Sequence, residues 1–168
     1  MKDAIATLTP EYSTHRMVQD YTNMLYMPAV KHGERLAANN YQLAKQFAEW
    51  KGMMNFNWHH VFVEAQATGQ DKVHVGEGVD IVARVKTGGL NPNNLRVEIY
   101  QGRANGGTAL KDVSVVPMEM TEQLADGSFK FKGAIVPNKG GSYLYGVRVV
   151  PNNPDLKNIH ELGLIRWA

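Results

Sequence analysis

Apolar residues in the first third of the chain recur with the period of an α-helix. Ser13 and Thr14 are good helix-capping residues and place a helix start at this point. The apolar positions that follow lie at offsets of four, seven and eight residues from the first, which is one face of a helix; they are Met17, Tyr21, Met24 and Leu25. Pro28 lacks an N–H and clashes with the turn before it. The pattern therefore predicts that this helix stops or kinks near Met27.

The helical period continues beyond that point and predicts a second helix. We expect this helix to loosen around Gly33 and to strengthen after Asn40. Its end near residues 56–58 should be soft, because Gly52 is a poor residue for a helix interior. The apolar residues of its second half share one side of a 3.6-residue repeat; they are Leu36, Leu43, Phe47, Trp50 and Met54. Residues 1–58 are thus predicted to form a helical arm.

From Val61 onward the period of the apolar residues changes from 3.6 to 2, which is typical of strands. Turn signals rich in glycine, asparagine and proline separate the runs, as expected for a sandwich or barrel of short strands. The clearest runs of alternation are residues 79–86, 95–100, 129–132 and 143–149. The predicted class is α+β in segregated order, with an all-β immunoglobulin-like sandwich at residues 59–168. The Cys–Trp–Cys signature of true immunoglobulins is absent.

Composition excludes several classes of protein. The chain has 168 residues, no cysteine and a formal net charge of +2, so it has no thiolate chemistry and no excess of basic residues for nucleic acid. No apolar run approaches the ~20 residues that span a bilayer. The N-terminal residues 1–5 lack the apolar core of a secretory signal. We expect a cytoplasmic protein that binds neither nucleic acid nor membrane.

Two histidines and a nearby glutamate are the first candidates for chemistry. His59 and His60 are adjacent, and neighbouring residues on a strand point to opposite faces. The two imidazoles should therefore be unable to coordinate the same metal ion, although His60 and Glu64 share a face. Zinc sites need three or four convergent ligands, and no third ligand is evident. We interpret the pair as part of a helix-to-strand junction, with no metal site.

Positive charge at the start of the first helix is a second candidate. His15 and Arg16 lie in its first turn, where free N–H groups favour an anion. No glycine-rich phosphate loop accompanies them. The preferred interpretation is an ion pair between Arg16 and Asp20 across one turn.

The remaining candidates are acidic pairs and aromatic rings. Glu119 and Glu122 fall in a loop-like stretch and are expected to be solvated rather than to act as a glycosidase pair. Tyr100 lies on the polar phase of its strand, which makes it the candidate for stacking on a sugar. Tyr143 and Tyr145 share their phase with valines and are expected to be mostly core. The final apolar run, residues 162–167, should form a strand that closes the sandwich. From the residues alone the chain has no catalytic site.

Several segments resemble a known enzyme family. The run at residues 13–21, STHRMVQDY, is similar to a Ser/Asn-Thr-x-Arg-Met-Val-x-x-Tyr segment near the end of the catalytic region in α-glucan phosphorylases of the bacterial and archaeal type. Related glucan synthases share this segment. Further similar stretches follow in the same order as in the phosphorylases; they are residues 26–29, 48–51, 95–102 and 163–168. Together with residues 1–10, the resemblance covers essentially the whole chain.

The resemblance implies an enzyme much larger than this chain. Phosphorylases of this family have a two-lobed glycosyltransferase fold and hold pyridoxal phosphate as a Schiff base. They cleave α-1,4-glucan with inorganic phosphate to give glucose 1-phosphate. Their cofactor-binding lysine and phosphate-binding residues belong to the catalytic lobes, and no position of this chain matches them. We therefore assign this chain no catalytic, cofactor-binding or metal-binding residue.

The favoured hypothesis is a non-catalytic C-terminal accessory module of such a phosphorylase. The apolar face of Met17, Tyr21, Met24 and Leu25 would then dock on the absent catalytic lobes, and alone it should self-associate or fray. One alternative is an independent carbohydrate-binding sandwich that holds α-glucan on Tyr100. The other is a structural or dimerisation domain, which would make the protein a homo-oligomer.

Overall fold

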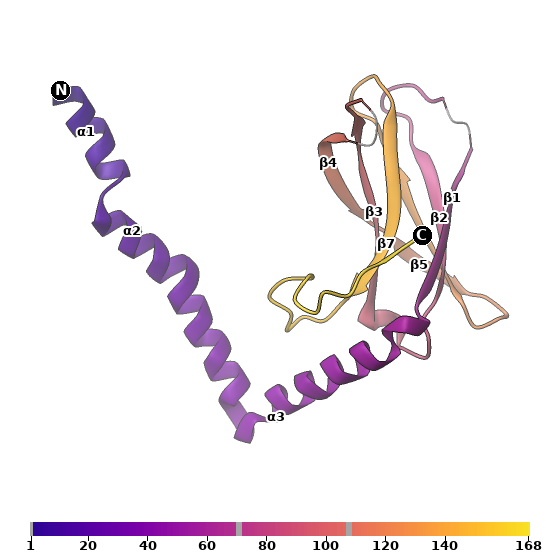
Figure 1. The fold of residues 1–168 in the computed structure, drawn as a ribbon, viewed down its shortest axis with the longest axis horizontal. Coiled ribbons are helices and arrows are strands. Elements are labelled where there is room, and N and C mark those ends of the chain that lie inside the picture. The colour runs from indigo at the N-terminus through magenta and orange to yellow at the C-terminus, as the bar shows by residue number, and fades with distance from the viewer. Residues whose placement is uncertain (1, 70–71, 107–108) are drawn as a thin grey trace. The chain divides into compact units, whose positions relative to one another are not determined.

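The computed structural model describes residues 2–69, 72–106 and 109–168 (Figure 1). The chain divides into two compact units, Met1–Trp50 and Lys51–Ala168. The α-helices come first along the chain and all strands follow, with a short 3-10 helix, Pro92–Asn94, between the second and third strands. The helices are α1 (Lys2–Glu11), α2 (Thr14–Tyr21), a π-helical turn (Thr22–Tyr26), α3 (Met27–Asn57) and a 3-10 turn (Trp58–His60).

The predicted helix start is confirmed, and near Met27, where a stop or kink was predicted, the helix changes its geometry instead. Ser13 caps α2, because its Oγ accepts a hydrogen bond from the backbone N–H of Arg16 at 3.2 Å. The chain does not leave the helix at Met27. It widens into the π-helical turn, in which the N–H of Met27 bonds to the carbonyl of Thr22. This turn absorbs the disturbance, and Pro28 then occupies the second position of α3.

The prediction that the second helix loosens around Gly33 is wrong. The break in α3 lies at residues 38–41, where Ala38 is extended and three consecutive residues have left-handed backbone angles. Asn39, Asn40 and Tyr41 have φ values of 51°, 55° and 61°. Asparagine tolerates this region better than most residues, which explains why the break falls on the Asn39–Asn40 pair. Gly33 retains helical geometry.

The strands form two antiparallel four-stranded sheets in the order β1-β2-β6-β5 and β4-β3-β7-β8. Their bounds are β1 (Phe62–Thr68), β2 (Val79–Lys86), β3 (Leu95–Ala104), β4 (Leu110–Pro117), β5 (Glu119–Gln123), β6 (Phe129–Ile135), β7 (Tyr143–Pro151) and β8 (Arg166–Trp167). The chain changes sheet at Met118, because β4 pairs with β3 and β5 pairs with β6. The prediction that helices are followed by a β-sandwich is therefore confirmed.

The four strands predicted from alternation are all present as β2, β3, β6 and β7. The prediction of a loop around Glu119 and Glu122 is wrong, because both residues lie on β5. This edge strand is exposed along its whole length, so its sequence lacks the alternation of a half-buried strand. The predicted closing strand over residues 162–167 is shorter than expected, and only Arg166 and Trp167 pair with β7.

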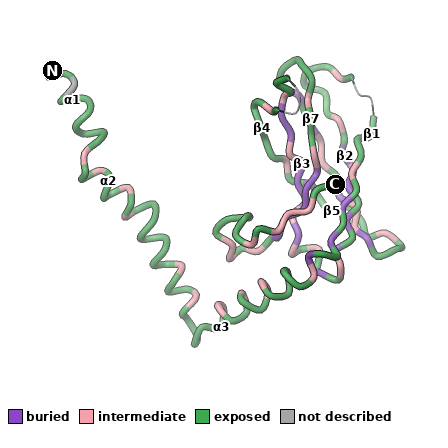
Figure 2. The backbone as a smooth tube through the Cα atoms, viewed as in Figure 1, coloured by how far each residue is buried: buried purple, intermediate pink, exposed green. Residues whose placement is uncertain are grey.

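The core lies between the two sheets, and buried residues gather there (Figure 2). One phase of β2, β3, β6 and β7 faces inward, as their alternation predicts. Gly133 marks a close approach of the sheets, because a methyl group there would lie 2.9 Å from Ile99 Cδ1 on the opposite sheet. The largest inward-facing buried side chains include Val63, Ile81, Val85, Val97, Ile99, Phe131, Val147 and Val149.

Candidate functional site

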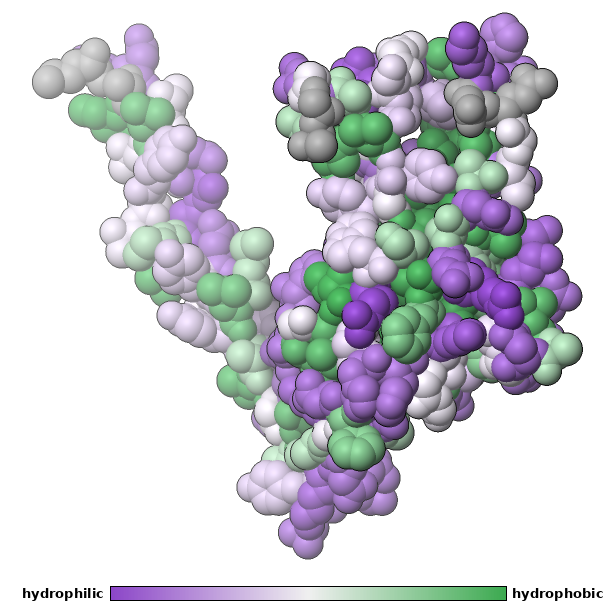
Figure 3. Space-filling view, turned by 45° about the vertical axis from the view of Figure 1, so that its right-hand side comes forward, coloured by the Kyte–Doolittle hydropathy of each residue, from purple (hydrophilic) through white to green (hydrophobic). Residues whose placement is uncertain are grey.

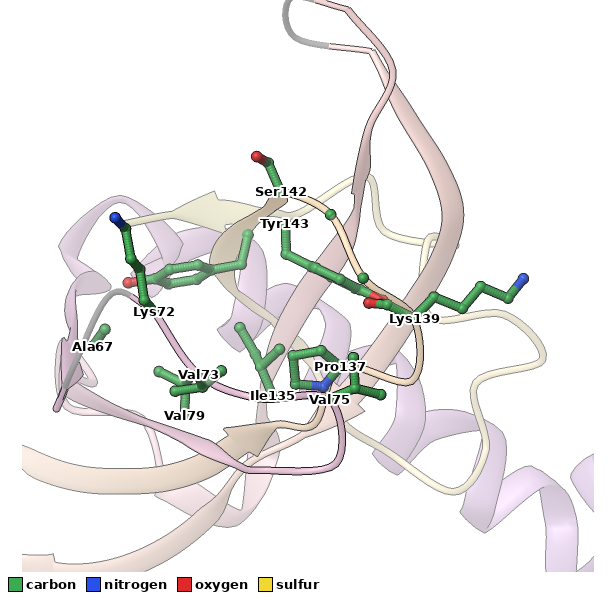
Figure 4. A pocket seen from close by; sticks show the side chains of 13 residues that line it. Ala67, Lys72, Val73, Val75, Val79, Ile135, Pro137, Lys139, Ser142 and Tyr143 are labelled. Atoms are coloured by element: carbon green, nitrogen blue, oxygen red, sulfur yellow. The ribbon is translucent and has the colours of Figure 1, made fainter.

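A pocket of about 560 Å³ lies in the β unit, where the inner faces of the two sheets end (Figure 4). Ala67 ends the inner face of β1, Val79 begins that of β2, and Ile135 closes β6. On the other sheet β7 supplies Tyr143 and Tyr145, two residues apart. They continue the inward phase of Val147 and Val149 toward this end of the sandwich.

The two tyrosines line the pocket instead of filling the core. Tyr143 is half-buried, and 41% of Tyr145 is exposed, so the prediction that both are mostly core is wrong. Their strand phase is inward as predicted. The reason for the difference is that the facing strands end near these positions and do not cover the rings.

Tyr143 also organises the loop that borders the pocket. Its hydroxyl lies 3.3 Å from Asn138 Oδ1 and 3.3 Å from the carbonyl oxygen of Lys139. This loop contributes residues 139–142 to the lining. Pro137, at the start of the loop, is buried, and its carbonyl accepts a hydrogen bond from the N–H of Gly76 at 2.9 Å. The loop that forms this wall of the pocket is thus fixed by hydrogen bonds at Pro137 and at Tyr143.

Polar groups surround the apolar floor of the pocket. Lys72 and Ser142 lie at its rim, whereas Lys139 reaches away toward Asp112, with 3.6 Å between Lys139 Nζ and Asp112 Oδ2 (Figure 4). Arg103 and then Lys139 lower the pKa of Asp112 below its usual value by hydrogen bonding and charge. Asp112 therefore compensates part of the positive charge of Lys139. Lys72 is the lysine whose charge remains at the rim of the pocket.

A buried amide lies next to this pocket. Gln101 pairs with Tyr145 in the register of β3 and β7, so the two side chains share the inner face of the sheet. The Gln101 side chain is buried, and its Oε1 accepts no hydrogen bond from any described residue. A buried acceptor without a donor is costly.

The structure places Tyr100 in a different setting from the exposed one that its strand phase predicted. Tyr100 is half-buried, and its ring meets the ring of Trp167 at 89° with 5.9 Å between their centroids. The guanidinium of Arg148 lies 5.4 Å from the Tyr100 centroid and 5.7 Å from that of Trp167. Arg148 is itself paired with Glu98. The Tyr100 ring is thus engaged within the protein.

The four residues predicted to dock on a partner are all exposed in the helical unit. Met24 is the most open, with 72% of it exposed, followed by Leu25, Met17 and Tyr21. Green apolar side chains along the helical segment are visible in Figure 3. The π-helical turn lies between Tyr21 and Met27, and the apolar residues around it are exposed as well; they are Val18, Tyr26, Met27 and Val30. The exposed apolar surface is therefore wider than the single face predicted.

Arg16 lies between two carboxylates at the start of α2. Its Nε lies 3.4 Å from Asp20 Oδ2, as predicted, and its Nη1 forms an ion pair with Glu11, which the sequence did not indicate. The hydrogen bond to Glu11 is the main cause of a raised pKa for Arg16. Because acidic groups flank it, Arg16 is poorly placed to bind an anion with His15.

The two histidines lie closer together than predicted. His59 and His60 belong to the 3-10 turn rather than to a strand, and their ring centroids are 3.7 Å apart. The expectation that they point to opposite faces is therefore wrong. Among the described residues no group of three or more histidine, cysteine or acidic side chains is placed to hold a metal ion. No helix in the described part of the chain has the length and apolar character needed to cross a membrane.

The fold is thus a helical segment followed by a two-sheet β module with a pocket at one end. Residues 58–168 match the sequence profile of the glycogen phosphorylase C-terminal domain. The chain belongs to this family, which confirms the resemblance seen in its sequence.

Individual relatives are phosphorylases. The chain is 30% identical over 170 residues to the maltodextrin phosphorylase of Thermococcus litoralis, an alignment covering 99% of this chain and 20% of the relative. It is 30% identical over 171 residues to the glycogen phosphorylases of Mycobacterium tuberculosis and Mycobacterium bovis, covering 100% of this chain and 20% of each relative. The chain thus spans about a fifth of the length of these relatives.

Proposed function

We propose that this chain is the non-catalytic C-terminal accessory module of an α-glucan phosphorylase. The whole enzyme would cleave α-1,4-glucan with inorganic phosphate and release glucose 1-phosphate. The family match and the fifth of the relatives' length that the chain spans support this proposal. The absence of cysteine fits a reducing compartment, and we place the enzyme in the cytoplasm.

The observation that carries the proposal is the exposed apolar surface of the helical unit. Soluble proteins seldom leave contiguous large apolar side chains in water, and such surfaces mark interaction sites. We propose that Met17, Tyr21, Met24 and Leu25 dock on the catalytic lobes of the phosphorylase. π-Helical turns occur frequently at functional sites, which agrees with one lying within this surface.

The cofactor of the proposed enzyme belongs outside this chain. Pyridoxal phosphate forms a Schiff base with a lysine whose amine is desolvated in an enclosed site. Every lysine in the described part of the chain is exposed or half-exposed, so none offers such a site. We therefore assign pyridoxal phosphate to the catalytic lobes.

We further propose that the sandwich is immunoglobulin-like and that the functional boundary lies between residues 58 and 59. The sheet β1-β2-β6-β5 has the order of the A-B-E-D sheet of immunoglobulin constant domains, and β3, β7 and β8 correspond in order to C, F and G. β4 adds an edge strand next to β3. The start of the family match at residue 58 supports the boundary.

The reading frame upstream of codon 1 in the source genome provides the first test. The proposal expects that frame to encode glycosyltransferase lobes with a lysine for pyridoxal phosphate. Co-expression of those lobes with this chain should give a complex that releases glucose 1-phosphate from maltoheptaose and phosphate. Replacement of Met24 and Leu25 by glutamate should dissociate the complex, whereas the same change at Gln19 and Asn23 should not. An upstream region without such lobes would overturn the proposal.

A further inference from the structure

We propose that the pocket at the end of the sandwich binds a glucosyl unit, with Tyr143 and Tyr145 as its walls. The choice of a glucosyl ligand rests on the proposed function, because the glucan and the glucose 1-phosphate of that reaction share this unit. The existence of a small-molecule site rests on the pocket alone. Its volume of about 560 Å³ lies within the roughly 300–1,000 Å³ of known small-molecule sites.

The two tyrosines supply the apolar surface that a sugar ring needs. A pyranose presents C–H groups on its faces and hydroxyls around its edge, so it packs against an aromatic ring and hydrogen-bonds at its perimeter. Tyr143 and Tyr145 are two residues apart on β7, so both rings line the same side of the pocket. Tyrosine is rigid and amphipathic, and its ring loses little entropy when it is covered.

The floor and rim match the remaining surface of a sugar. Val73, Val79 and Ile135 form an apolar floor (Figure 4). Lys72 and Ser142 at the rim provide donors for ring hydroxyls.

Charge sets the class of ligand. No carboxylate lines the pocket among the described residues, and the Lys139 ammonium is directed to Asp112. The pocket therefore favours a neutral or anionic sugar over a cation. A glucan end and glucose 1-phosphate both satisfy this condition. They differ in phosphate, which the Lys72 ammonium at the rim would attract.

Titration calorimetry on the full 168-residue chain tests the inference, with maltoheptaose and glucose 1-phosphate in separate arms. Binding in either arm at low millimolar Kd or better is the expected result. Binding in the glucose 1-phosphate arm alone identifies the sugar phosphate as the ligand. Binding in the maltoheptaose arm identifies the glucan. Absence of heat in both arms overturns the inference and leaves the upstream-frame test of the proposed function unaffected.

Variants locate the site. Tyr145→Ala should weaken binding about tenfold, which is ~1.4 kcal/mol, and Tyr145→Phe should retain most of it. Leu144→Ala is the matched control, because Leu144 is equally exposed at 41% but points to the other face of β7. Tyr100→Ala should leave binding unchanged. Loss of binding in Tyr100→Ala with retention in Tyr145→Ala would overturn the inference.

Spectroscopy keeps the inference testable if Tyr145→Ala does not fold. Added sugar should shift the methyl resonances of Val79 and Ile135 in the unaltered chain. Shifts confined to methyl groups remote from the pocket, such as those of Leu90, would overturn it.

Discussion

Arg148 donates from Nε to Glu98 Oε2 at 2.8 Å, and its Nη2 lies 2.8 Å from the same oxygen. The two residues are directly opposite each other on β7 and β3. Glu98 is fully buried, and Arg96 Nε lies 2.6 Å from its other oxygen. Tyr100 and Trp167 flank the Arg148 guanidinium. This pair therefore joins the central strands of one sheet and anchors the aromatic residue of β8.

Removal of the Glu98 charge should destabilise the β unit strongly. Glu98→Gln leaves the Arg148 guanidinium buried without its counter-charge, and we expect a loss of about 3 kcal/mol in the free energy of unfolding. The double variant Glu98→Leu with Arg148→Met should recover most of this loss, because an apolar pair replaces two buried charges. Urea denaturation followed by tryptophan fluorescence measures both. A single variant as stable as the unaltered chain would contradict this role.

Acid should weaken the contact between β2 and the turn before β6. Hydrogen bonds from Ser128, and then from Arg84, lower the pKa of Asp126 to about 2. A carboxyl group with a depressed pKa contributes stability above its unfolded pKa near 4 and loses it as the pH falls through about 2. Asp126→Asn should thus be less stable than the unaltered chain at pH 7, and the difference should vanish near pH 2. Thermal unfolding across this range measures it, with Asp80→Asn as the control on β2.

Gly88 should tolerate no side chain. Its φ of 63° is left-handed, and a Cβ there would lie 2.6 Å from His60 Cβ and 3.0 Å from the His60 carbonyl carbon. We expect Gly88→Ala to cost about 3 kcal/mol, through strain and the clash together. Gly89→Ala isolates the strain, because Gly89 has a φ of 85° and no atom within 4 Å of its Cβ position. Its cost should be about 1 kcal/mol. Equal costs in urea denaturation would exclude the clash.

The chain alone should self-associate through its helical unit. Met24 and Leu25 are large, apolar and exposed, so association removes them from water. Light scattering should show a mass that rises with concentration, and Met24→Glu with Leu25→Glu should give a monomer. The control is Gln19→Glu with Asn23→Glu, which adds the same charge at exposed polar positions nearby. A monomer at all concentrations before any substitution would count against an exposed docking surface.

The local pattern of apolar residues was sufficient to predict the half-buried strands, and the capping residues were sufficient to predict the start of α2. Strands β2, β3, β6 and β7 each bury one face, so their sequences alternate. Strand β5 is exposed on both faces, and nothing in its own residues distinguishes it from a loop. Its place depends on backbone hydrogen bonds to β6, which periodicity does not record. The break at residues 38–41 could not be predicted from local propensity, because glycine disfavours a helix interior more than asparagine does, yet Gly33 stays helical and Asn39 and Asn40 do not.

The family, the order of helices before strands and the inward phase of Tyr143 and Tyr145 could all be predicted from the residues alone. The lining of a pocket by these rings follows from the packing of the folded chain, because their exposure depends on where β1, β2 and β6 end on the facing sheet. The same packing places Tyr100 against Trp167 and Arg148, residues distant in sequence that strand pairing brings together. Side-chain phase is a local property of a strand. Burial is set by what the rest of the chain places opposite that strand.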